Sequence, residues 1–379
     1  MALKTTHPVL GTRALNRATL DRQLLLRRAS LGAEDAVSHL LGLQAQNTKP
    51  PYYALAARLE GFRPEDLSSL MESRAVARIV TMRSTVHTHT ARDAVALRGL
   101  AQSGAIDREL AIFVGRKGLD GVDLDRLAAL SRELVEERPR TPKQLREELL
   151  KEWPGADPLS LSVAARCLLP LIQVTPRGLW GRPGQVALTT TDVWFGRDGG
   201  EAADVDETVL RYLGAFGPAS VRDMQTWSGL TGLREAFERL RPRLALFQDE
   251  RGTELFDLPD ASRPDEDTPA PPRFLPEFDN LLLSHADRSR VVSSENRSRT
   301  WKGNQAYRVF LLDGFVAGRW HLAETKARVT MTIEPFEPHG SGRDAERQRA
   351  ELVAEAERTL GVLAPQGVPY EIGFGTPEL

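Results

Sequence analysis

The chain has 379 residues, of which 41% are hydrophobic and 27% charged, so it can bury a substantial core without disulfides or structural metals. Its 50 lysines and arginines nearly balance its 52 aspartates and glutamates, for a net charge of −2, which neither predicts nor excludes nucleic-acid binding. The single cysteine, Cys167, excludes an intramolecular disulfide and any multi-cysteine metal site. It lies in an apolar run, which predicts a buried side chain rather than a nucleophile.

Membrane insertion and secretion are not indicated by the sequence. No run of about 18 apolar residues predicts a transmembrane helix. The N-terminal residues lack the uninterrupted apolar stretch of a secretory signal. With one cysteine in the chain, these features predict a protein of the reducing cytoplasm.

The first hundred residues predict helices followed by a hairpin. Residues 14–28 and 33–43 have apolar side chains at helical spacing. A third helix begins at the Pro50-Pro51 pair, and a fourth spans 63–73. Residues 77–93 are rich in β-branched side chains, which predicts a β-hairpin. Helices followed by a hairpin are the pattern of a winged helix.

This pattern recurs at residues 123–189 and again at 206–258. The sequence therefore predicts three tandem winged-helix motifs, with a generic α/β mixture as the alternative. A proline-rich acidic linker at 259–272 follows, then segments of strand composition that predict a small β-barrel, then a charged helix at 343–363. The expected organisation is α+β, with motifs at 1–118, 119–198 and 199–260, and a linker, barrel and C-terminal helix at 261–379.

The most unusual local feature is Gln44-Ala45-Gln46, between two predicted helices. A glutamine does not ionise, but its carboxamide can hold a water or an amide-like group by paired donors and acceptors. Residues two apart do not share a face of a helix, whereas they do in an extended segment. The pair can cooperate only if the chain has left helical geometry there, and the following Asn47-Thr48-Lys49-Pro-Pro sequence favours that.

The first hairpin carries polar side chains that predict a contact with a nucleic-acid backbone or lesion. His87 and His89 share one strand face, but they lack an obvious third ligand for a metal. A polar hairpin face without function is the alternative. The predicted nucleic-acid contacts are a phosphate-binding arginine at the turn and four strand residues: Arg83, Thr85, His87, Thr88 and His89.

Two further regions carry candidate DNA contacts. Residues 285–302 hold clustered cations, which phosphate neutralisation requires, although a solvated face is an equally good interpretation. Trp180, in the second hairpin, could stack on a base or pack onto its own sheet. The candidate DNA-contacting cations of residues 285–302 are Arg288, Arg290, Arg297, Arg299 and Lys302.

Four segments together resemble the AlkZ-type winged-helix DNA glycosylases over nearly the whole chain. They are the glutamine turn, MRSTVHTHTARD at 82–93, PRGLWGRPG at 176–184 and LPEFDNLLLSHADRSRV at 275–291. Gln-apolar-Gln is the most specific of these. A related branch carries an aspartate in place of the second glutamine, so this chain resembles the AlkZ branch.

The resemblance implies three winged helices around a β-barrel, forming a concave DNA-binding channel. It also implies excision of alkylated purines from double-stranded DNA, with Gln44 and Gln46 as the catalytic motif. The resemblance implies no cofactor or metal. It implies a monomer that is associated with the bacterial nucleoid. Some members unhook interstrand crosslinks made by natural products such as azinomycin, as self-resistance proteins.

This chemistry is consistent with two glutamines. A guanine alkylated at N7 is positively charged and already a good leaving group, so the enzyme mainly has to position a water beneath C1′. Carboxamide dipoles can face the developing oxocarbenium ion. A winged-helix transcription regulator and a DNA-damage binder without catalysis remain as alternatives.

Overall fold

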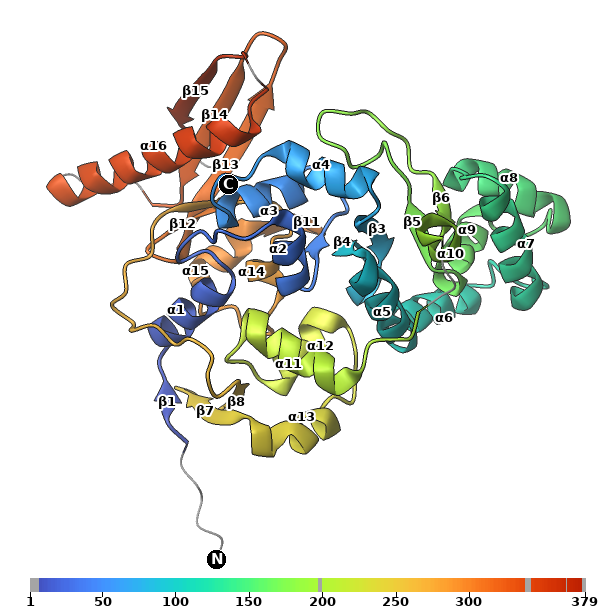
Figure 1. The fold of residues 1–379 in the computed structure, drawn as a ribbon, viewed down its shortest axis with the longest axis horizontal. Helices are drawn as coiled ribbons and strands as arrows, with labels where there is room; N and C mark the ends of the chain where they lie inside the picture. The colour runs from blue at the N-terminus through green and yellow to red at the C-terminus, as the bar shows by residue number, and fades with distance from the viewer. Residues whose placement is uncertain (1–6, 197–199, 338–341, 366, 377–379) are drawn as a thin grey trace, which may run out of the picture.

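The computed structural model describes residues 7–196, 200–337, 342–365 and 367–376. The predicted boundary between residues 198 and 199 lies outside these ranges. The described chain is a mixture of helices and strands, as the α+β prediction requires (Figure 1). Among these residues, no helix is both long and apolar enough to cross a membrane.

The N-terminal region consists of short helices around one hairpin. Prolines occupy the first turn of α3, where their missing N–H groups cost little. The first helix ends at Arg22 and not at Arg28 as predicted, because Leu24 has a left-handed backbone (φ 57°) and Leu25 and Leu26 turn into the core. The elements are β1 (Val9–Leu10), α1 (Thr12–Arg22), α2 (Ala33–His39), β2 (Leu43–Gln44), α3 (Pro50–Arg58), α4 (Pro64–Glu72), β3 (Val76–Val80), η1 (Met82–Ser84), β4 (Val86–Thr90), α5 (Ala91–Ala101), the π-helix η2 (Gln102–Ile106) and α6 (Asp107–Gly115).

The second group of helices begins after α6 and is capped by side chains. Asp123, Thr141 and Asp157 each accept hydrogen bonds from the first turn of the helix that follows. Cys167 is buried in the third of these helices, as predicted. The elements are α7 (Leu124–Glu137), α8 (Pro142–Glu152), α9 (Pro158–Leu168), β5 (Leu171–Gln173), β6 (Leu188–Thr190) and α10 (Thr191–Phe195).

A five-stranded sheet of order β2-β4-β3-β5-β6 joins the first and second groups. The predicted hairpin pairs β3 with β4, and the opposite edge of β3 pairs with β5, so that Arg78 lies opposite Gln173. The predicted boundary at residue 118 therefore lies between strands of a single sheet, to which segments 1–118 and 119–198 both contribute.

The third group has three helices followed by an antiparallel hairpin, and β1 adds to that hairpin as a parallel strand. Its core is aromatic: Tyr212, Phe216 and Trp227 pack with ring centroids 5.2 to 5.6 Å apart. The elements are α11 (Val205–Phe216), α12 (Val221–Ser228), α13 (Arg234–Leu240), η3 (Arg241–Arg243), β7 (Ala245–Asp249) and β8 (Glu254–Asp257).

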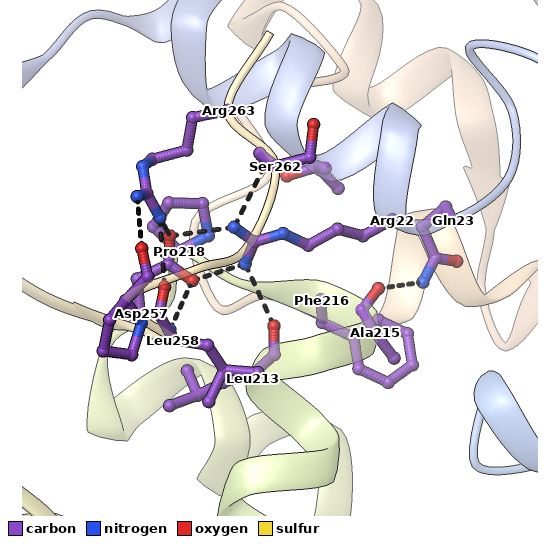
Figure 2. Close-up of polar contacts among 12 residues, drawn as sticks. Arg22, Gln23, Leu213, Ala215, Phe216, Pro218, Asp257, Leu258, Ser262 and Arg263 are labelled. Carbon is purple, nitrogen blue, oxygen red and sulfur yellow. Dashed lines mark hydrogen bonds and ion pairs between the residues drawn. The ribbon is translucent and has the colours of Figure 1, made fainter. Parts of the chain in front are cut away.

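Figure 2 shows the polar cluster that attaches α1 to the third group. The buried Arg22 guanidinium donates to both carboxylate oxygens of Asp257, at 2.5 and 2.8 Å, and to the Leu213 carbonyl. Asp257 is fully buried and also accepts from Arg263 Nη1 at 2.7 Å. The neighbouring Gln23 donates to the Ala215 carbonyl at 2.6 Å. These contacts join segments that are more than 190 positions apart in the chain.

The C-terminal strands form an open sheet and not the predicted barrel. Their order is β15-β14-β13-β12-β9, and in the described residues the two edge strands do not pair. α3 and α16 pack against the edge strand β9, and two other strand segments form a separate ribbon, β10-β11. The elements are β9 (Arg273–Leu275), α14 (Asn280–Leu283), α15 (Ser294–Arg297), η4 (Ser298–Thr300), β10 (Trp301–Lys302), β11 (Gln305–Ala306), β12 (Val309–Leu312), β13 (Phe315–Glu324), β14 (Val329–Pro335), α16 (Arg343–Leu363) and β15 (Tyr370–Phe374).

Candidate active site

Gln44 ends strand β2 and Gln46 lies in the bend that follows, so neither residue is in a helix. Gln44 pairs with His87 in the β2-β4 ladder, and the Ala45 amide donates to the Val86 carbonyl at 2.7 Å. The two glutamine side chains meet: Gln44 Nε2 donates to Gln46 Oε1 at 3.2 Å. Gln44 is only 6% exposed, whereas Gln46 is exposed. The non-helical geometry that cooperation requires is therefore present, but only Gln46 is open to a ligand.

Arg83 connects this pair to the third group of helices. It adopts a left-handed backbone (φ 54°) between β3 and β4. Its Nη2 donates to Gln44 Oε1 at 2.8 Å, and its Nη1 donates to the Trp227 carbonyl of α12. The sequence predicts a phosphate contact for Arg83, but most of its donors are used within the protein. Its observed partners make it a bridge between α12 and the glutamine turn.

His87 lies behind Arg83 and is buried. Its Nδ1 is 2.9 Å from the Thr85 carbonyl, which can only accept, so Nδ1 carries the proton. Nε2 is then free to accept from Arg83 Nη2 at 3.3 Å. Burial, followed by the charge of Arg83, lowers the pKa of His87 well below its ordinary value. His87 is a neutral hydrogen-bond acceptor for Arg83.

The other predicted hairpin contacts face the protein. His87, Thr88 and His89 are buried in this structure, and a DNA contact by any of them stays a prediction. These side chains are on β4, which lies between β2 and β3, and packing covers them. Thr85 is half-buried and donates its hydroxyl to the Met82 carbonyl at 3.1 Å. The described residues contain no group of three His, Cys, Asp or Glu side chains that could hold a metal.

The buried histidines predict a loss of stability in acid. Burial lowers the pKa of His89 to about 4, against the opposing effect of Asp93. The unfolded chain takes up a proton at this histidine as the pH falls below 6.5, whereas the folded chain does not until the pH is near 4. The free energy of unfolding should therefore fall between pH 6.5 and 4, by at most about 1.4 kcal/mol per pH unit for each such histidine.

Urea unfolding followed across this pH window measures the effect. A His89→Gln variant should have a shallower slope, and an unchanged slope in that variant would contradict the prediction.

The basic segment at 285–302 separates into buried and available cations. Arg290 is buried and donates to the Pro218 carbonyl at 2.8 Å, and its DNA contact stays a prediction. Arg299 pairs with Glu337 and donates to the Phe336 carbonyl. Three cations have no ion-pair partner in the described parts of the chain: Arg288, Arg297 and Lys302.

Among the available cations, the charge of Arg288 affects Arg83, which contacts Gln44. Its guanidinium lies 5.5 Å from the centre of the Trp301 ring, and its Nε is buried without a described partner. Burial, followed by the charge of Arg288, lowers the pKa of Arg83 to about 10. The charge of Arg297 in turn acts on Arg288. The charges of Arg297, Arg288 and Arg83 thus oppose one another in this part of the described structure.

Trp180 packs on α3 and not on its own sheet. Its ring lies 4.9 Å from the Tyr52 ring and 6.2 Å from the Tyr53 ring, and its amide donates to Ser68 Oγ at 3.0 Å. The side chain is half-buried. The long segment between β5 and β6 thus lies against the helix that follows the glutamine turn, and a stacking contact with a base remains a prediction.

The fold and the glutamine turn can now be compared with known proteins. A family model described as DNA glycosylase AlkZ-like matches residues 37–362, which include both glutamines and the hairpin. The chain belongs to the AlkZ-like DNA glycosylase family.

This AlkZ-like chain is 25% identical over 349 residues to an interstrand DNA cross-link repair glycosylase of Streptomyces sahachiroi. The aligned region covers 82% of this chain and 88% of that protein. The solved structure of Streptomyces sahachiroi DNA glycosylase AlkZ matches with a TM-score of 0.78 and 20% identity, over 96% of this chain and 100% of the other. That structural likeness shows the common fold.

Two features of the AlkZ-like site are not identified by the sequence analysis. Arg78, on β3, is buried and donates to the Ala45 carbonyl between the two glutamines at 2.6 Å. Asn47 donates to Glu277 Oε1 at 3.1 Å, and Glu277 Oε2 accepts from Arg308 Nε at 2.8 Å. A signal exists for the first: Arg78 is the one charged residue in the five-residue strand VARIV. Nothing in the sequence links Asn47 to Glu277, 230 positions away.

Proposed function

We propose that this AlkZ-like protein is a monofunctional DNA glycosylase that hydrolyses the N-glycosidic bond of N7-alkylated purines in double-stranded DNA. The observation that carries the proposal is the exposed Gln46 carboxamide, held by a buried partner glutamine in an extended turn. Family membership supplies the reaction class, and the residues supply the selectivity for a leaving group that is already cationic.

The two glutamines have different roles in the proposed reaction. Gln44 Oε1 accepts from Arg83, and Gln44 Nε2 donates to Gln46 Oε1, so Gln44 fixes the orientation of Gln46. Gln46 Oε1 retains a second lone pair that can accept a hydrogen bond from the attacking water. Gln46 is thus the proposed catalytic residue, and Gln44 acts through it.

The chemical step requires no strong base. The glycosidic bond breaks with its electron pair moving to N9, which neutralises the cationic purine and leaves an oxocarbenium ion at C1′. A water held by Gln46 adds to C1′ and releases its proton to solvent. Gln46 contributes position and an oriented dipole, the terms that preorganised sites supply. Since no Schiff base forms, we expect an abasic site and no strand cleavage by the protein itself.

The proposed DNA complex uses the three groups of helices as winged helices. Each of the second and third groups has three helices followed by paired strands. The positive charge of Arg288, in the C-terminal region, acts on Arg83, in the first group. We propose that these groups line a concave channel for the duplex, that the protein acts as a monomer, and that it works at the nucleoid in the cytoplasm.

The proposed lesions include bulky adducts such as interstrand crosslinks. The relative from Streptomyces sahachiroi is named for cross-link repair, so interstrand crosslinks made at purine N7, such as those of azinomycin, are proposed substrates with a role in self-resistance. An exposed Gln46 favours limited displacement of the base in this proposal.

Release of the free base tests the proposed function. Duplex DNA containing 7-methylguanine, and separately azinomycin-crosslinked DNA, is incubated with the protein, and the products are separated by chromatography. We expect free alkylated base, and strand breaks only after heat or alkali. Tight binding to damaged DNA without base release would indicate a damage binder instead of an enzyme. Tight binding of a dimer to one undamaged palindrome would indicate a transcription regulator.

The available cations predict a salt-dependent DNA affinity. Replacing Arg288 and Arg297 together by alanine should weaken binding to lesion-free and lesion-containing duplexes alike. The slope of log K against log salt should fall in magnitude by about 0.9 for each phosphate that the variant no longer neutralises. Fluorescence anisotropy over a salt series measures both quantities. Arg328, exposed and paired with Glu371, supplies the matched control, and an equal slope change in Arg328→Ala would contradict the assignment.

A further inference from the structure

Arg78 lies behind the glutamine turn and contacts its backbone. Its side chain is 1% exposed. Nη2 donates to the Ala45 carbonyl at 2.6 Å and Nη1 to the Asn47 carbonyl at 3.5 Å. These two carbonyls flank Gln46, whose side chain is exposed. A single guanidinium therefore holds the backbone on both sides of Gln46.

The buried charge of Arg78 has no carboxylate partner among the described residues. Its remaining contact is the Gln173 carboxamide of β5, with Oε1 3.3 Å from Nη2 and 3.4 Å from Nε. A buried cation without an acid is costly, and here only carbonyl oxygens offset that cost. The guanidinium of Arg78 is not required for the pairing of β3, and its main partners are two carbonyls of the glutamine turn. We therefore interpret its role as holding that turn.

The segment between β5 and β6 holds the arginine in place. Gly178 has φ +98°, and a Cβ there would lie 2.7 Å from Arg78 Cδ. The Gly178 carbonyl accepts from the Tyr52 hydroxyl at 2.7 Å, and Tyr52 belongs to α3, the helix after the glutamine turn. Arg78 is thus enclosed between the turn on one side and this segment of the second group on the other.

We propose that Arg78 is a positioning residue for excision: its fork of donors holds the Ala45 and Asn47 carbonyls so that Gln46 presents its carboxamide to the attacking water. This inference rests on the proposed glycosylase function, and it adds a buried residue of β3 that touches neither DNA nor water. Because the fork spans two acceptors, a point charge at the same place does not replace it.

The test compares Arg78→Met with a matched variant elsewhere. Arg98 is also a buried arginine that donates to two backbone carbonyls, those of Cys167 and Leu169, and neither carbonyl belongs to the glutamine turn. Single-turnover excision of 7-methylguanine, affinity for the same duplex and the thermal midpoint are measured for both. We expect Arg78→Met to slow excision about 10- to 100-fold with little change in affinity, since a misplaced group can lose about that much. Arg98→Met should lower the midpoint while excision by the folded protein stays at the wild-type rate.

Two further variants keep the inference testable if Arg78→Met does not fold. Arg78→Lys retains the charge but loses the two-pronged guanidinium. Gly178→Ala leaves Arg78 in place in the sequence, but the added methyl group would displace its side chain. Both variants should slow excision. Wild-type excision by Arg78→Lys, or an equal loss in Arg98→Met, would overturn the positioning role. If Gln46→Ala excises normally, the proposed function itself fails, whereas a defective Gln46→Ala beside a normal Arg78→Lys removes only this inference.

Discussion

Replacement of Gln46 by alanine is expected to slow single-turnover excision of N7-alkylated purines about 100-fold or more, because the attacking water loses its positioned acceptor. Affinity for the lesion duplex should change little, since Gln46 is one exposed side chain of a large polar interface. Rapid mixing with excess protein, followed by alkali cleavage of the products, measures the rate. The affinity comes from anisotropy with the same duplex.

The same experiment separates the roles of the two glutamines. Gln44→Ala should also slow excision, by removing the donor that orients Gln46, but by less than Gln46→Ala, because the exposed carboxamide remains. Gln348, exposed on α16, is the matched control, and its alanine variant should excise at the wild-type rate. A greater loss in Gln44→Ala than in Gln46→Ala would reverse the assignment of the catalytic residue.

Replacement of Asp257 by asparagine is expected to lower the free energy of unfolding by about 3–5 kcal/mol, the usual cost of leaving a buried charge without its partner. Arg22 is almost fully buried and directs two nitrogens at this carboxylate, and Arg263 directs a third. Asparagine preserves the shape but not the charge. Urea unfolding monitored by tryptophan fluorescence measures the change.

The exposed pair of Arg239 and Asp206 provides the control on the same group of helices. Asp206→Asn should leave the unfolding midpoint nearly unchanged, because solvent already screens that pair. Equal midpoints for Asp257→Asn and wild type would show that the cluster in Figure 2 does not stabilise the attachment of α1 to the third group.

Local sequence signals predicted the elements near the candidate site. The prolines after Lys49 and the β-branched residues on both sides of Arg83 correctly placed α3, β3 and β4, and the extended geometry of the glutamine turn followed from them. These signals act within a few residues, so they do not depend on the rest of the fold.

The exposure of charged side chains could not be predicted in the same way. Arg288 and Arg290 are two positions apart in one basic run, yet the second is buried because Pro218 and Thr19 supply acceptors from distant segments. The histidines of β4 are buried because elements outside the hairpin, among them α2, pack onto it, and no local pattern encodes that packing. The open C-terminal sheet likewise depends on where α3 and α16 pack.

The sheet shared by the first two groups has a consequence for synthesis on the ribosome. The strand β3 reaches its second partner only after β5 has been made, much later in translation. Until then its outer edge offers unpaired backbone groups, which attract other strands in a crowded cell. Arg78 lies on that edge, opposite Gln173. The nascent chain therefore lacks the Gln173 contact of Arg78 until β5 has been made, and exchange of the first group between relatives would have to carry β5 with it.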